Sequence, residues 1–386
     1  MVGVICEPGF DTNLWTKQQY CNITTEFRRR RIKYSVFEKI YDVYNLKTEE
    51  QIIIFAFGYT EAWYNYVVQR CNMMNLRIIT VGGYCPRSTN GIFSCVISDV
   101  RNSAIDIYNY FTAYDKKRVI LYGVNTFSDF DLKLETEMSE IFPKEDLYVI
   151  RKEGSKESVI KSFFDVCNQY NAVVCTNDYD AVELLCEIKR KNPDFINRSF
   201  LVSFSNTLLS FLYSPSVTTF YESATENTKN VIKLYYMLIQ NPEISNIYLY
   251  VREKLKIRET THYCPYSSPV FSQSSAALLN DTDVCNNIDC AVDSVDTSEV
   301  VDELHKIENM ILGFDKSDFS ILSLFLNKKT TTEIADILYI SRGSVRYRLD
   351  KMLEKLGLSS KEKMAELISR YITMEALVEY SDDYLS

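Results

Sequence analysis

Four neighbouring side chains near the C-terminus combine positive charge with hydrogen-bonding capacity: Arg346, Tyr347, Arg348 and Lys351. Ser341 can cap the start of a helix over this segment and Gly357 can end it. The apolar side chains of that helix would share one inward face, which consists of Val345, Leu349, Met352 and Leu356. The polar side chains then face outward or flank that face. Arginine can bond a guanine edge and lysine can neutralise a phosphate, so the surface suits the DNA major groove. A merely solvated basic face is the alternative interpretation.

The segments before this helix complete a helix-turn-helix plan. Residues 317–326 are predicted to form one helix and residues 331–338 a second, entered by the threonines at 330–332. Glu333 lies where a negative charge favours a helix start, and Tyr339-Ile340 makes the turn. The predicted DNA-contacting residues are Thr331, Arg342, Arg346, Tyr347, Arg348 and Lys351.

The charge distribution agrees with a separate C-terminal module. The 386-residue chain has a net charge of −9. Residues 314–371, however, hold 11 basic and 8 acidic side chains, whereas residues 262–313 hold 9 acidic side chains and one lysine. The tail, 372–386, has four acidic side chains and no basic one. A mildly basic block between acidic segments suggests a module with a polyanionic partner.

The amino-acid composition limits the classes of protein to which this chain can belong. An ordinary mixture of 46% hydrophobic and 25% charged residues predicts a globular chain of two or three domains. No run of about 18 apolar residues occurs, so we expect no membrane partner. Eleven scattered cysteines without a CxxC pair favour reduced thiols and a cytoplasmic location, with no metal and no cofactor.

Catalytic motifs are missing. The two histidines, His262 and His305, do not stand in any recognisable Ser/His/Asp or Cys/His arrangement. No phosphate-binding loop, HExxH or GxSxG pattern occurs, and only 11 glycines are present. We therefore expect a protein that is not an enzyme.

Residues 1–261 alternate apolar strands with helices of 10–15 residues, which predicts parallel sheets covered on both faces. Two such series indicate two doubly wound α/β lobes followed by a small all-α domain. Ligands of such sheets bind beyond the carboxyl ends of the strands, which for two lobes places the site in a cleft between them. The expected segments are lobe one at about 1–100 and 241–261, lobe two at about 102–240, a flexible acidic linker at 262–298 and an amphipathic linker helix at 299–312. That helix could dock on its own domain or pair with a second chain.

The C-terminal segment 314–371 resembles the LuxR-type helix-turn-helix domain. The matching positions are Glu333-Ile334-Ala335, Ile340-Ser341, Ser344-Val345-Arg346 and Lys355-Leu356-Gly357. Three departures are Lys328 in place of glycine, Ser344 in place of threonine, and Arg348 where histidine is common. The stretch SVRYRLDKM also resembles the helix-turn-helix of PucR-type activators. Either resemblance implies binding to double-stranded DNA. The LuxR-type resemblance further implies that the last helix, about 361–371, pairs two copies into a homodimer.

Residues 1–261 resemble the effector-binding domain of LacI-type regulators, which has a periplasmic-binding-protein-like type I fold. Three stretches carry the resemblance: 173–178 (VVCTND), 200–207 (FLVSFSNT) and 214–220 (SPSVTTF). Asp99 matches the aspartate at the family's crossover between lobes. The resemblance implies a small-molecule effector, and the C-terminal module would replace the family's N-terminal DNA-binding domain.

The expected effector site combines resemblance with position. The family's effector-contacting aspartate falls on Ser205, followed by Asn206, and its basic residue falls near Lys133, while Asp178 is kept. Aromatic side chains that could stack on a sugar or base lie at strand tips. The predicted ligand-binding residues are Phe10, Trp15, Tyr59, Asp99, Lys133, Asp178, Ser205 and Asn206.

Together these features predict a transcription regulator that senses a small polar, sugar-like ligand between two lobes and changes the DNA binding of its C-terminal module. Two alternatives stay open. The lobes could lack a ligand and serve as a dimerisation or protein-docking platform. The C-terminal helices could instead bind a protein.

Overall fold

A computed structural model describes residues 1–10, 14–45, 52–81, 91–266, 297–311, 314–372 and 377. The chain divides into two compact units. Of the described residues, those in 1–99 and 222–252 form unit 1, and those in 100–221 and 253–377 form unit 2. We call unit 1 lobe one, the sheet-bearing part of unit 2 lobe two, and residues 314–372 the C-terminal module. The acidic tail and most of the expected linker, residues 267–296, lie outside the described residues.

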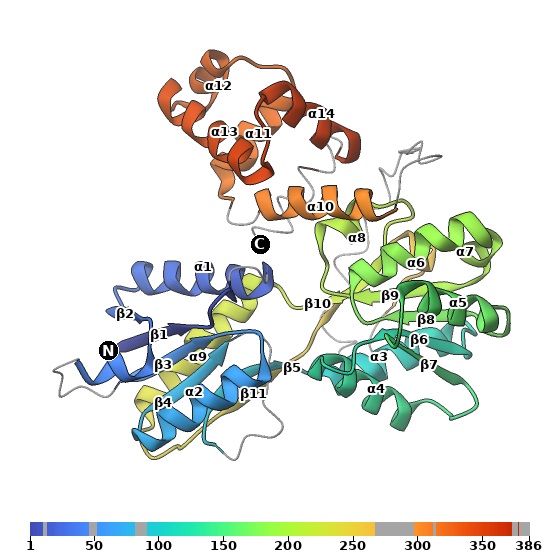
Figure 1. The fold of residues 1–386 in the computed structure, drawn as a ribbon, viewed down its shortest axis with the longest axis horizontal. Coiled ribbons are helices and arrows are strands. Elements are labelled where there is room, and N and C mark those ends of the chain that lie inside the picture. Colours follow the sequence, from blue (N-terminus) through green and yellow to red (C-terminus); the bar gives the residue numbers. More distant parts are fainter. Residues whose placement is uncertain are drawn as a thin grey trace. The chain divides into compact units, whose positions relative to one another are not determined.

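Lobe one is built on a parallel six-stranded sheet (Figure 1). In sheet order its strands are β11 (Tyr248–Val251), β5 (Ser94–Ser98), β4 (Arg77–Val81), β3 (Ile53–Phe57), β1 (Val2–Cys6) and β2 (Tyr34–Phe37). The helices are α1 (Leu14–Arg29), α2 (Glu61–Met73) and α9 (Ala224–Gln240). All five residues of β3 are buried, as expected of a central strand covered on both faces.

Lobe two repeats the plan with one antiparallel edge strand. In sheet order its strands are β12 (Lys254–Lys256), β10 (Thr218–Tyr221), β9 (Phe200–Phe204), β8 (Ala172–Cys175), β6 (Val119–Val124) and β7 (Leu147–Arg151). The helices are α3 (Val100–Ala113), α4 (Asp129–Ile141), α5 (Lys156–Val166), α6 (Asp178–Lys191), α7 (Asp194–Arg198) and α8 (Leu208–Leu212). The expected fold class, two doubly wound α/β lobes with a small all-α domain, is confirmed.

The lobe boundaries differ from the expectation after the first crossing. The chain passes between units after Asp99, after Tyr221 and after Arg252, so α9 belongs to lobe one and not, as expected, to lobe two. The reason is packing, because Val231 and Leu238 of α9 lie in one apolar cluster with Phe55 of the lobe-one sheet. Strand β11 lies in the lobe-one sheet, as expected, but β12 lies in the lobe-two sheet, so residues 253–261, expected in lobe one, belong to unit 2.

The C-terminal module consists of four capped helices. They are α11 (Lys316–Leu326), α12 (Thr331–Leu338), α13 (Arg342–Leu356) and α14 (Lys361–Tyr371). Thr330 and Glu333 form a reciprocal capping box at α12. Ser341 accepts the Ser344 N–H at the start of α13, and Gly357 ends that helix with a φ of +66°. Between them Tyr339 takes the left-handed conformation that turns the chain.

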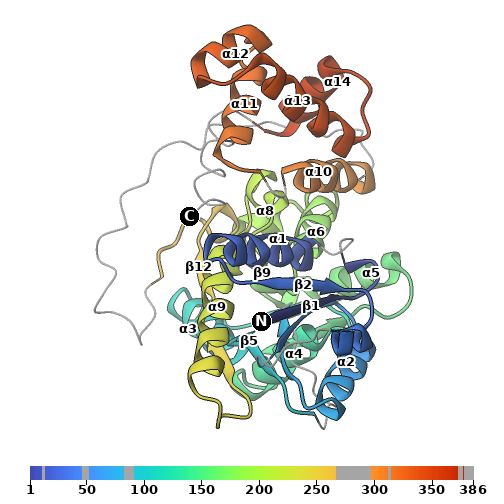
Figure 2. The ribbon, with the colours of Figure 1, turned by 90° about the vertical axis from the view of Figure 1, so that its left-hand side faces the viewer.

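Helix α10 (Thr297–Ile311) precedes the module and packs within its own chain, against α6 and α8 of lobe two and against α13 and α14 (Figure 2). Its side chains Leu304, Ile307 and Ile311 are buried in an apolar cluster that includes Leu208 of α8 and Val345 of α13. The side chain of Val300, an apolar residue of the same helix, lies outside the described residues. One continuous core therefore joins lobe two to the C-terminal module.

No helix in the described ranges is both long and apolar enough to cross a membrane.

Candidate functional site

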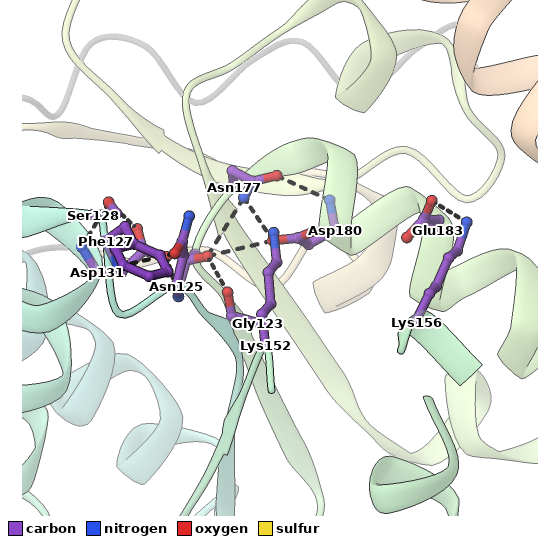
Figure 3. Close-up of polar contacts among 11 residues, drawn as sticks. Gly123, Asn125, Phe127, Ser128, Asp131, Lys152, Lys156, Asn177, Asp180 and Glu183 are labelled. Atoms are coloured by element: carbon purple, nitrogen blue, oxygen red, sulfur yellow. Dashed lines mark hydrogen bonds and ion pairs between the residues drawn. The ribbon is translucent and has the colours of Figure 1, made fainter. Parts of the chain in front are cut away.

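Loops at the carboxyl ends of β6, β7 and β8 place polar side chains and one phenyl ring along one edge of the lobe-two sheet (Figure 3). Ser205 follows the neighbouring strand β9 at the same edge. We call this group, Asn125, Phe127, Lys152, Asn177 and Ser205, the lobe-two edge. Parallel strands bring these loops together although they are up to 80 positions apart in sequence. The edge offers amides, an ammonium group, a hydroxyl and an aromatic face.

Asp180 holds two side chains of the lobe-two edge, Lys152 and Asn177, in place. Its Oδ2 lies 2.8 Å from Lys152 Nζ and accepts a hydrogen bond of 2.6 Å from Asn177 Nδ2. Burial raises the pKa of this carboxyl, and the Lys152 charge opposes that rise. Gly123 lets the carboxylate approach, because its φ is +84° and a Cβ there would lie 2.9 Å from Asp180 Oδ2. Lys152 is thus held at the edge by a carboxylate beneath it.

The β6–α4 loop carries the exposed aromatic side chain of the edge. Asn125 Oδ1 accepts the Phe127 N–H at 3.0 Å, and Asp131 Oδ2 accepts the Asn125 N–H at 2.8 Å. Ser128 caps α4 and also bonds Asp131. The Phe127 side chain is 96% exposed. The loop therefore presents a phenyl ring on a backbone that these hydrogen bonds hold in place.

Asp178, predicted as a ligand contact, is a buried anchor. Its carboxylate accepts the Ser203 hydroxyl, the Thr219 hydroxyl at 3.0 Å, and the N–H and hydroxyl of Thr207 at 2.6 and 3.0 Å. Burial raises its pKa, and the bonds from Ser203, Thr207 and Thr219 oppose the rise. These bonds tie the start of α6, just after β8, to β9, β10 and the start of α8.

The two residues that the resemblance places at the effector lie directly after β9. Ser205 is exposed with a φ of 112°, and Asn206 has a φ of 52°. The Asn206 Oδ1 accepts a 2.5 Å bond from the Arg258 guanidinium, which is itself buried. Ser205 therefore belongs to the edge, whereas the Asn206 amide oxygen is engaged within lobe two.

Lobe one has its own group at the carboxyl end of β1. An open cavity of about 410 Å³ is lined by residues that include Glu7, Phe10 and Tyr20. Glu7 is buried and accepts the N–H groups of Tyr59 and Thr60 at 2.7 and 3.0 Å. The Phe10 ring meets Tyr20 edge to face, with 5.2 Å between ring centres. Phe10, one of the predicted ligand-binding residues, thus lines this cavity.

Four other predicted ligand residues lie in different settings. Tyr59 is partly exposed at the end of β3, and its hydroxyl donates to Pro8 at 3.4 Å. Trp15 lies in α1, and its side chain is outside the described residues. Asp99 is the last residue before the first passage between units, as expected from its match to a crossover. Lys133 lies on α4 and forms an ion pair with Glu137.

Sequence reasoning missed Asn125, Phe127, Lys152 and Asn177. Each follows the carboxyl end of a strand by one to three positions. That position was the available signal, because parallel strands gather such residues at one edge. An aromatic face with converging amide and ammonium groups is a combination that holds polar rings such as sugars.

A second candidate site, for nucleic acid, lies on α13. Val345, Leu349, Met352 and Leu356 are buried, as expected from their shared face. Arg342, Arg346 and Lys351 are exposed, Tyr347 is 67% exposed, and Thr331 is half-buried at the start of α12. The exposed face of α13 thus carries two arginines, a tyrosine and a lysine.

Arg348 is held within the module. Its Nη1 lies 2.5 Å from Asp318 and 3.0 Å from Asp315, the residue that caps α11. Burial opposes ionisation of Asp315, but the Asp318 N–H and the Arg348 guanidinium outweigh it and lower the Asp315 pKa. Arg348 therefore fastens α13 to the start of α11, and its predicted DNA contact would require leaving or sharing this pair.

Arg348→Ala is expected to destabilise the module by about 1 kcal/mol, because both carboxylates lose their partner in a half-exposed setting. Arg346→Ala, which removes an exposed arginine two positions away, should leave stability unchanged. Thermal unfolding of the two full-length variants checks the difference. Equal melting temperatures would show that the Arg348 pair does not stabilise the fold.

Comparisons with known proteins concern the fold. No protein-family model matches the chain, and no curated protein matches its sequence. Among solved structures, the transcriptional regulator CelR in complex with cellobiose aligns with a TM-score of 0.52 at 10% identity, over 67% of this chain and 84% of that one. A LacI family transcriptional regulator from Enterococcus faecalis V583 with bound ribose aligns with a TM-score of 0.50 at 14% identity, over 68% of this chain and 99% of that one. The chain is thus similar in fold to LacI-type regulators.

Proposed function

We propose that this protein is a DNA-binding transcription regulator, not an enzyme, whose lobes hold a small polar ligand. Its α13 would enter the DNA major groove. The observation that carries the proposal is the exposed basic face of α13, borne by a module that shares one core with lobe two. In this arrangement a change in lobe two is transmitted by packed side chains to the surface that contacts DNA.

The ligand part of the proposal rests on the lobe-two edge and on fold similarity. Ribose and cellobiose are bound by the two similar regulators named above. The edge has a phenyl ring, two amides and a lysine in the arrangement described above. A sugar-like ligand would stack on Phe127 and bond Asn125, Asn177 and Lys152.

The DNA part rests on geometry and on the LuxR-type resemblance of the module. Arg346 and Arg342 are proposed to contact bases, while Lys351 and Thr331 are proposed to contact phosphates. The protein is proposed to act as a homodimer, as the resemblance of α14 implies. Two-fold symmetry would then appear in the DNA sequence it binds.

A specific observation favours the alternative function, a dimerisation or protein-docking platform without a ligand. Two of the predicted ligand-binding residues, Asp178 and Asn206, use their side-chain oxygens for bonds within lobe two. A lobe that satisfies these groups internally needs no ligand to hold its shape. A ligand screen separates the two functions.

A thermal-shift screen of the full-length protein against sugars, nucleosides and amino acids tests the ligand. A saturable hit at a hundredfold excess over Kd should stabilise the binding lobes by about 2.7 kcal/mol. If no compound in a broad library shifted the transition, the platform function would replace ligand sensing.

Phe127→Ala is expected to weaken binding of the hit roughly tenfold, because the ligand loses its stacking partner. Stability without ligand should not change, since the ring is almost wholly exposed. Thr126→Ala, an exposed neighbour on the same loop, is the matched control. Isothermal titration of the three proteins measures the effect, and equal affinities would move the ligand site away from this loop.

A further inference from the structure

Helix α10 is fastened to lobe two by a buried carboxylate. Glu308 is only 7% exposed. Its Oε1 accepts the Leu208 N–H at 2.9 Å, and its Oε2 accepts the Tyr179 hydroxyl at 2.8 Å. The same hydroxyl lies 2.9 Å from His305 Nδ1, one turn earlier on α10. These bonds sit among apolar side chains, where a carboxylate needs its donors to remain buried.

The same helix is fastened to the C-terminal module at other positions. Glu303 accepts bonds from the Arg370 guanidinium at 2.9 Å and from the Tyr371 hydroxyl at 2.5 Å, both on α14. Lys355 of α13 donates to the Met310 carbonyl at 3.0 Å. Helix α10 therefore has separate polar contacts for the lobe and for the module.

The lobe contact leads back to the lobe-two edge through a short segment. Leu208 follows Thr207, whose N–H and hydroxyl are held by Asp178. Before them come Ser205 and Asn206, both with positive φ, which is unfavourable for residues other than glycine. Residues 205–208 thus begin with two residues of positive φ and end with two held residues, Thr207 bonded by Asp178 and Leu208 bonded by Glu308.

We propose that α10 is a latch that Glu308 closes on lobe two, and that a ligand which rearranges residues 205–208 withdraws the Leu208 N–H and undocks the C-terminal module. The ligand step rests on the proposed function, but the latch itself does not. Undocking would free the module to adopt the orientation that paired copies need on DNA.

The charged and titratable groups near Glu308 make the latch sensitive to pH. Burial raises the Glu308 pKa to about 7; the bonds from Leu208 and Tyr179 oppose the rise and the Asp178 charge adds to it. Helix α6 contributes Asp178 and Tyr179, α10 contributes His305, and α8 contributes no titratable side chain. Lys355 and Arg370, from α13 and α14, bond α10 at Met310 and Glu303 instead.

Because the docked state raises this pKa above that of an exposed glutamate, the docked state binds the proton more tightly. Docking is therefore strongest at low pH, weakens as pH rises between about 4.5 and about 7, and is weakest above that range. Glu308→Gln keeps an oxygen for the Leu208 N–H and cannot ionise. Its docking should lack the weakening between about pH 4.5 and about 7 that Glu308 causes in wild type.

Hydrogen exchange of the full-length protein, without ligand or DNA, tests the latch. In Glu308→Ala, amides of α8 and of the lobe-facing turns of α10 should exchange at least tenfold faster than in wild type. Amides within α12 and α13 should keep their protection, which shows that the module stays folded. Asp302→Ala, an exposed acid on the same helix, is the matched control and should match wild type.

A second experiment measures hydrogen exchange of the same α8 and α10 amides in wild type and Glu308→Gln between pH 5 and 8. The exchange rates are corrected for the intrinsic pH dependence of exchange. Wild type should lose protection as pH rises, and Glu308→Gln should not. Unchanged α8 and α10 exchange in Glu308→Ala, or the same pH profile for wild type and Glu308→Gln, would overturn the latch. Neither readout involves DNA or ligand, so failure of the proposed function would be seen separately.

Discussion

Replacing Arg346 and Lys351 together with alanine should lower the affinity of the full-length protein for duplex DNA at least tenfold. An arginine bonded bidentately to a base contributes about 1–3 kcal/mol of discrimination. A lysine at a phosphate contributes through counterion release, so its loss should reduce the slope of log K against log salt by about one. Both side chains are exposed on α13, so the variant should fold normally.

Fluorescence anisotropy with a mixed-sequence duplex of about 30 base pairs, at several salt concentrations, measures this effect. A double variant, Lys316→Ala with Lys363→Ala, removes two exposed positive charges outside α13 and controls for net charge. It should keep most of the wild-type affinity. An equal loss in this control would mean that general charge, and not the α13 face, accounts for binding.

Asp178→Ala should cost about 3–5 kcal/mol of stability, several times the effect of breaking the half-exposed Arg348 ion pair. The substitution leaves the Ser203 and Thr219 hydroxyls and the Thr207 N–H without their buried acceptor. Each unsatisfied buried donor costs about 1–3 kcal/mol, and the hydroxyls can recover part of this by rotating to other partners. Chemical unfolding of the full-length protein, followed by circular dichroism, gives the change in the lobe-two transition.

Two further variants test whether the lost stability comes from the missing hydrogen-bond acceptor. Asp178→Asn should lose less, because its amide oxygen can accept from Thr207 while its NH₂ donates to the two hydroxyls. Asp165→Ala removes an exposed carboxylate that pairs with Lys161 and should be nearly neutral. If Asp178→Ala were as stable as Asp165→Ala, Asp178 would not be the anchor of β8, β9 and α8, and a direct ligand role would become the better explanation.

The C-terminal module could be predicted closely from the sequence because its boundaries are set by local chemistry. Thr330, Ser341 and Gly357 are cap residues whose preference for helix ends does not depend on distant parts of the chain. The apolar face of α13 follows from spacing alone. Strand and helix order in the lobes was predictable for the same reason.

The passages between lobes were harder to predict because periodicity identifies elements but not the sheet they join. Helix α9 belongs to lobe one and strand β12 to lobe two, against the expected bounds, because their apolar pattern would fit either lobe. Strand β5, with serines at both ends, gives an apolar signal too weak to predict a strand. Its place next to β4 depends on tertiary pairing.

In the candidate sites, too, some features could be predicted from local spacing, whereas others depend on tertiary contacts. Tyr347 and Lys351 could be placed on the outer face of α13 by counting residues. The partners of Arg348 lie about 30 positions earlier in the chain, so its ion pairs could not be anticipated from spacing. The lobe-two edge required knowledge of which strands are neighbours, and the contacts of Glu308 required the docking of α10 on α6 and α8.

The most direct measurement is selection of duplexes from a randomised DNA library by the full-length wild-type protein, in parallel with the Arg346→Ala, Lys351→Ala double variant. A DNA-binding regulator that reads bases through α13 should enrich a recurring sequence, with two-fold symmetry if it binds as a homodimer. The double variant should not enrich that sequence. Recovery of no recurring sequence by wild type, or of the same sequence by both proteins, would contradict DNA recognition through this helix.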